Sequence, residues 1–84
     1  MTKRELQRVF NSKVYAFAES LGYDIEDNGD GSCVTFVHPD STSGYDSIDY
    51  SRSQQDIYYV NWASNKVKED AVKIEAYIDQ LKAA

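Results

Sequence analysis

Residues 23–37 read YDIEDNGDGSCVTFV, and this stretch decides the fold class. Its first residues alternate acidic and apolar side chains, and its last five are rich in β-branched and aromatic residues, so both ends favour strands. Between them, Asn28-Gly29 is typical of a tight hairpin turn because both residues tolerate a positive φ angle, and Asp30-Gly31 can widen that turn. Strands joined by so short a connection run antiparallel.

Further strands are expected after this hairpin. Residues 39–44 (PDSTSG) are typical of a loop. Residues 45–51 hold Ile48 and Tyr50 spaced apart from acidic residues, which is compatible with a third strand. Residues 57–62 (IYYVNW) have the composition of a stronger one.

An amphipathic helix is predicted on the N-terminal side of the hairpin, over residues 3–21. Thr2 and Glu5 fit a capping box, and Gly22 suits the left-handed position that ends a helix. Asn11 and Ser12 are expected on its polar face. The apolar stripe consists of Leu6, Val9, Phe10, Val14, Phe17, Ala18 and Leu21.

A second amphipathic helix is predicted near the C-terminus, with Ser64 or Asn65 as its cap. Its stripe consists of Val67, Ala71, Ile74, Ile78 and Leu81. The resulting order is α-β-β-(β)-β-α over a single domain, residues 1–84. We therefore predict an α+β fold, an antiparallel sheet of three or four strands with both helices on one face.

The charge is distributed unevenly. The chain has a net charge of −5, but residues 22–60 hold eight acidic residues and one arginine, a net −7, whereas residues 1–21 carry a net +2. An acidic middle repels phosphate, so we expect no direct binding of nucleic acid. Two interpretations stay open: a solvated acidic surface, or an acidic patch that binds a basic partner protein.

The hydrophobic runs and the cysteine count of the sequence bear on where the protein is located. No apolar run is long enough to span a bilayer, and we expect no membrane association. Cys33 is the single cysteine and cannot form an internal disulfide, which favours a reducing compartment, the cytoplasm.

No enzyme or metal site is predicted. Residues 26–31 look at first like a calcium loop, but Val37 stands where a bidentate carboxylate is required, so we interpret them as a turn. His38 is the only histidine, and no partner for acid–base catalysis is evident. We expect no cofactor and no catalytic residue.

The tyrosines are the most unusual feature, seven in 84 residues. Tyrosine is common at protein interfaces because it offers apolar area with a polar tip. Tyr58 shares strand parity with Asp56, although Tyr59 would replace it if Asp56 precedes the strand. The alternative is that the tyrosines only support the core. The predicted partner-binding residues are Asp46, Asp49, Tyr50, Asp56 and Tyr58.

One local pattern comprises Gly22-Tyr23, Gly31-Ser32, Phe36 and His38-Pro39-Asp40. It resembles HicA-type toxins, small RNA-cleaving proteins with a fold like double-stranded RNA-binding domains. The resemblance implies an α-β-β-β-α order. It argues against the activity, because Cys33 stands where the family has its catalytic histidine.

As a class, a small acidic α/β protein without a catalytic constellation is similar to phage-encoded inhibitors such as anti-CRISPR and anti-restriction proteins. These often use carboxylates to block a nucleic-acid-binding surface. We therefore predict a non-enzymatic protein-binding module with a basic partner. The alternatives are an RNA-binding or degenerate HicA-like domain that uses Lys66 and Lys68, and an assembly subunit that forms a homodimer through its sheet.

Overall fold

The computed structural model describes residues 2–27, 33–39, 47–59 and 63–83. The predicted α+β class and element order are confirmed, with four strands. The Asn28-Gly29 turn, most of the 39–44 loop and Asp46 lie outside the described residues. The elements are α1 (Lys3–Ser20), β1 (Asp24–Asp27), β2 (Cys33–Val37), β3 (Ser47–Ser51), β4 (Asp56–Tyr58) and α2 (Asn65–Ala83).

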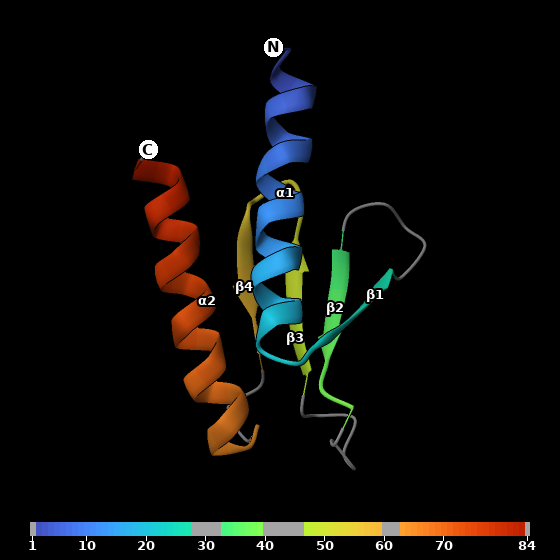
Figure 1. Cartoon of the computed structure of the whole chain (residues 1–84), viewed down its shortest axis with the longest axis vertical. Helices are drawn as coiled ribbons and strands as arrows, with labels where there is room; N and C mark the ends of the chain where they lie inside the picture. Colours follow the sequence, from blue (N-terminus) through green and yellow to red (C-terminus); the bar gives the residue numbers. More distant parts are fainter. Residues whose placement is uncertain (1, 28–32, 40–46, 60–62, 84) are drawn as a thin grey trace.

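The four strands form an antiparallel meander in the order β1-β2-β3-β4. In the register of β2 and β3, Val34 lies opposite Tyr50 and Phe36 opposite Ile48. Side chains that lie opposite each other share a face, and all four of these are buried. α1 crosses in front of the sheet in Figure 1, and buried residues of both helices share one core with the buried sheet residues, which confirms the prediction that the helices cover one face.

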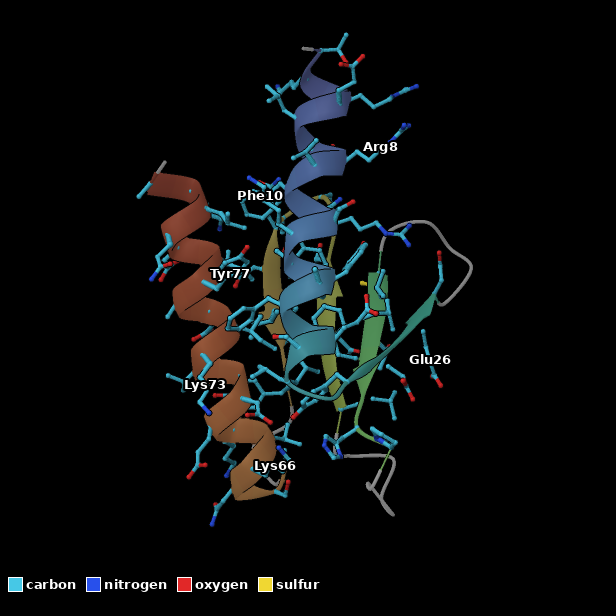
Figure 2. The ribbon with its side chains drawn as sticks, in the orientation of Figure 1. Arg8, Phe10, Glu26, Lys66, Lys73 and Tyr77 are labelled. Carbon is cyan, nitrogen blue, oxygen red and sulfur yellow. The ribbon has the colours of Figure 1, made fainter. Side chains whose placement is uncertain are left out.

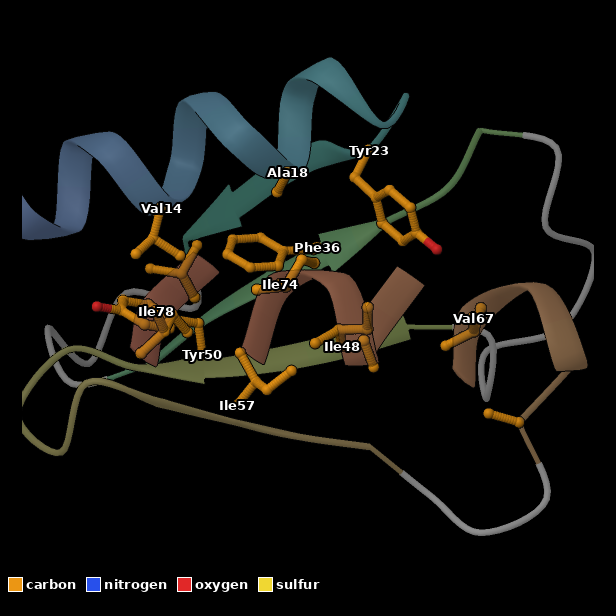
Figure 3. Packing of buried hydrophobic residues seen from close by; sticks show 13 residues of the cluster. Val14, Ala18, Tyr23, Phe36, Ile48, Tyr50, Ile57, Val67, Ile74 and Ile78 are labelled. Carbon is orange, nitrogen blue, oxygen red and sulfur yellow. The ribbon is translucent and has the colours of Figure 1, made fainter. Parts of the chain in front are cut away.

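The core lies between this face and the helices (Figure 3). Its largest fully buried side chains include Tyr50, Phe36 and Ile48 of the sheet. Tyr15 of α1 packs edge-on against the rings of Phe36 and Tyr50, with centroid distances of 6.2 and 5.8 Å. Such edge-to-face pairs add stability beyond the buried area, so α1 is held to the centre of the sheet.

The predicted helix ends are confirmed where the structure describes them. The Oγ1 atom of Thr2 accepts a hydrogen bond from the backbone N–H of Glu5 at 3.1 Å. Gly22 has a φ angle of 98°, which an L side chain rarely adopts, and it ends α1 as expected. Of the two caps considered for α2, Ser64 is the one that accepts an N–H, from Val67 at 3.4 Å.

Two predictions about α1 were wrong. Leu6 and Val9 were expected in the apolar stripe, but their side chains are 55% and 40% exposed. The reason is visible in Figure 1, where the N-terminal turns of α1 project past the sheet. Asn11 was expected on the polar face but is buried on the same side of α1 as Val14 and Ala18, where its Oδ1 atom accepts a hydrogen bond from the Tyr50 hydroxyl at 2.6 Å.

Candidate protein-binding surface

The face of the sheet that the helices leave uncovered carries charges of one sign. The register places on it the alternate residues of each strand, those that lie on the opposite side from the buried ones. Every charged residue among those described there is acidic. We define the acidic sheet face as Asp24, Glu26, Asp49, Asp56 and Tyr58.

The acidic residues are spaced so that their fields add. Glu26 lies opposite Thr35 and Thr35 opposite Asp49, so Glu26 and Asp49 are two strand spacings apart, about 10 Å. Asp56 lies diagonally across from Asp49, a separation of about 7–8 Å. These separations are close to the Debye length of about 8–10 Å at physiological salt. The face therefore presents one continuous negative potential.

Short-range hydrogen bonds orient the side chains of this face. The Thr35 hydroxyl donates to Oδ1 of Asp49 at 3.0 Å. The Oδ1 atom of Asp56 accepts from the backbone N–H of Ile57 at 2.9 Å. The Tyr58 hydroxyl donates to Oε1 of Gln54, and the Tyr58 side chain is 49% exposed. An exposed aromatic side chain with a fixed hydroxyl loses little entropy on binding.

The structure brings together three of the five predicted partner-binding residues. Asp49, Asp56 and Tyr58 share the uncovered face, and because Asp56 begins β4, Tyr58 is the tyrosine with the matching parity. Asp46 lies outside the described residues. Asp24 and Glu26 were missed, although their alternation with Ile25 is visible in the sequence.

The prediction for Tyr50 was wrong. Tyr50 is 0% exposed, because it follows Asp49 in β3 and points to the opposite face, under the helices. Burial, followed by the proximity of Tyr15, raises the pKa of the Tyr50 hydroxyl well above its usual range. It supports the core and cannot contact a partner.

A second polar cluster joins Tyr23, the residue before β1, to α2. Oδ2 of the buried Asp70 accepts hydrogen bonds from the Tyr23 hydroxyl at 2.7 Å and from Nζ of Lys66 at 3.0 Å. Burial would raise the pKa of Asp70, but these two hydrogen bonds and the charge of Lys73 outweigh it and lower the pKa. His38 packs edge-on against Tyr23 at a centroid distance of 5.3 Å. The contacts satisfy a buried carboxylate, which is a structural role.

The described residues contain no group of three or more His, Cys, Asp or Glu side chains that could hold a metal ion. Within the same ranges, neither α1 nor α2 combines the length and the apolar character that crossing a membrane requires.

Comparisons with family models, curated proteins and solved structures found no match. The resemblances to HicA-type toxins and to phage inhibitors therefore stay predictions.

Proposed function

We propose that the protein is a non-enzymatic binding module whose acidic sheet face binds a basic surface on another protein. The observation that carries this proposal is that the described charged residues on the uncovered sheet face are all acidic. A surface that serves only solubility needs no such segregation, whereas a single-signed patch steers a partner of opposite charge.

The chemistry of the partner follows from this surface. Carboxylates spaced about 7–10 Å apart on a sheet can pair with several arginine and lysine side chains at once. Proteins display such clusters of cations where they bind the phosphate backbone of nucleic acids. We therefore propose a nucleic-acid-binding protein of the cytoplasm as the partner. Occupying its basic surface would inhibit it, as the class-level likeness to phage-encoded inhibitors implies.

The two kinds of residue on this face have different roles in the proposed complex. The carboxylates speed the encounter through long-range attraction, and Tyr58 holds the complex together through short-range contact. Neutralising the acids should therefore slow association, and added salt should slow association of the wild type.

The test is a quantitative pull-down from the native host with three forms of the protein. The first is the wild type, and the second carries Glu26→Gln, Asp49→Asn and Asp56→Asn. The third is the matched control with Glu69→Gln, Glu75→Gln and Asp79→Asn, exposed acids on α2. We expect a basic protein to be captured by the wild type and by the control but lost from the sheet-face variant. Equal capture by all three forms would contradict the proposal.

The contacts of Lys66 weaken the RNA-binding alternative. Lys66 donates to Asp70, so part of its charge is already compensated within the protein. The homodimer alternative would bring two acidic sheet faces together, and like charges repel.

In a gel shift at low salt, we expect no retardation of duplex DNA, duplex RNA or single strands. Micromolar binding that weakens steeply with salt would favour the RNA-binding alternative.

A further inference from the structure

A groove of about 480 Å³ lies between α1 and the turn that joins β3 to β4. Among the residues that the structure describes, its lining contains three arginines and no acidic residue. The residues that line it are Arg4, Gln7, Arg8, Asn11, Ser12, Tyr15, Arg52 and Ser53. A groove of this size is in the range that binds small molecules.

Arg52 lines this groove, which we call the arginine groove. Its Nε atom donates to the Tyr15 hydroxyl at 3.0 Å, and one Nη atom donates to Oδ2 of Asp27 at 2.7 Å. These hydrogen bonds raise the pKa of Arg52 above its usual value. Gln7 of α1 donates to the Arg52 carbonyl at 2.8 Å, so the turn is tied to the helix. The guanidinium is thus held in one position at the groove, and its ion pair with Asp27 already compensates part of its charge.

Arg4 and Arg8 line the groove from α1. They stand four residues apart on α1, so their side chains lie on the same side of the helix, and both are exposed. Figure 2 shows Arg8 pointing away from α2. The ion pairs found within the described residues involve other cations, Arg52, Lys66 and Lys73.

The position of these two arginines is unfavourable for the free helix. Two like charges four residues apart repel, and cations near a helix N-terminus oppose the helix dipole. An anion bound between them would reverse both effects. A bound anion would therefore stabilise this part of α1.

We propose that the arginine groove binds the phosphate group of a small phosphorylated molecule. Guanidinium groups match the geometry of phosphate oxygens and bind them in pairs, and the hydroxyl of Ser12 supplies a neutral donor in the same lining. A small ligand is favoured over a nucleic acid strand because the whole chain carries a net charge of −5. One phosphate group needs only the groove, whereas a strand needs an extended basic surface.

The test is an NMR titration that follows backbone amides and the arginine Nε–Hε signals, with pyrophosphate as the first probe and adenosine diphosphate as the second. The variants are Arg4→Gln and Arg8→Gln. The matched control is Lys82→Gln, which removes one exposed positive charge from the end of α2. A circular dichroism melt checks that each variant is folded.

We expect saturable shifts at Arg4, Arg8 and Ser12, with affinity reduced about tenfold by either arginine substitution and unchanged by Lys82→Gln. Tighter binding of adenosine diphosphate than of pyrophosphate would identify an organic phosphate as the ligand, and equal binding would identify the phosphate group alone. Shifts spread over the lysines of α2, or equal weakening in the Lys82→Gln control, would overturn the proposal. A single-stranded oligoribonucleotide that binds more tightly than either probe would also overturn the assignment to a small molecule.

Discussion

The two faces of the sheet have opposite chemistry, although the same short strands form both. In β3, Ile48 and Tyr50 are fully buried under the helices, whereas Asp49 between them is exposed on the acidic sheet face. Successive side chains of a strand point to opposite faces, so five residues encode both a part of the core and a part of a surface. Whether a strand residue can contact a partner therefore depends first on which of the two faces its position in this alternation gives it.

The largest expected effect is the difference in unfolding free energy between substitutions on the two faces of β2. Phe36→Ala removes a fully buried ring and should lower the free energy of unfolding by about 3–5 kcal/mol. Thr35→Val, its neighbour on the uncovered face, should change it by less than about 0.5 kcal/mol. Urea denaturation measures both. If Phe36→Ala does not fold, Ile48→Val should still cost about 0.5–1.5 kcal/mol, and equal effects on the two faces would break the comparison.

The second prediction contrasts the two tyrosines that were expected on one surface. Tyr50→Phe leaves the buried Oδ1 atom of Asn11 without its donor and should cost about 1–3 kcal/mol. Tyr58→Phe removes an exposed hydrogen bond and should cost less than about 0.5 kcal/mol. A double-mutant cycle with Asn11→Ala should show coupling for Tyr50 and none for Tyr58. Coupling to Tyr58 would contradict the assignment of faces.

The third prediction concerns Asp70 of α2, the one buried carboxylate among the residues that the structure describes. The pKa of Asp70 is lowered in the folded protein, so the unfolded chain binds its proton more readily. The stabilising contribution of Asp70 should be present above the unfolded pKa of about 3.9 and lost as the pH falls through the lower folded pKa. Asp70→Asn should flatten the fall in stability over this acidic range, as followed by thermal melts.

Glu75→Gln on the exposed side of α2 is the control for this experiment. As the pH is lowered, the stability of this control variant should fall about as steeply as that of the wild type. An unchanged slope in the Asp70→Asn variant would show that the contacts of Asp70 with Tyr23 and Lys66 do not stabilise the fold.

The smallest expected effect concerns the acidic sheet face itself. Neutralising Asp24, Glu26, Asp49 and Asp56 together relieves mutual repulsion and should raise stability by a few tenths of a kcal/mol at low salt. The gain should vanish at about 1 M salt, where the Debye length is about 3 Å. Calorimetric melts at two salt concentrations measure it. A loss of stability at low salt would mean that these acids serve the fold and not a partner.

Local pattern predicted most of the fold. The helical spacing of Val67, Ala71 and Ile74 and the β-rich run from Cys33 to Val37 are short-range properties, and both elements formed where expected. The failures have a common cause. Leu6 and Val9 fit a helical stripe as well as Val14 does, but periodicity does not show where the sheet beneath a helix ends.

The sequence predicts only part of the acidic sheet face, again because a local pattern does not show how the elements pack. Strand parity joined Asp56 to Tyr58 within one strand, but the face that the helices cover cannot be derived from one strand alone. The sequence pattern therefore predicts the wrong face for Tyr50. It also does not show that Asp24 and Glu26 share a face with Asp49.

The sequence by itself determined the element order, the helix caps and the concentration of acid in the middle of the chain, because each depends on neighbouring residues. The tertiary structure alone decided which strand face is covered, the pairing of Tyr50 with Asn11, and the arginine groove. Gln7 and Arg52 are 45 residues apart in the chain and meet only because α1 lies across the sheet. Contacts between such distant residues depend on how elements pack, and periodicity within one element carries no record of its neighbour.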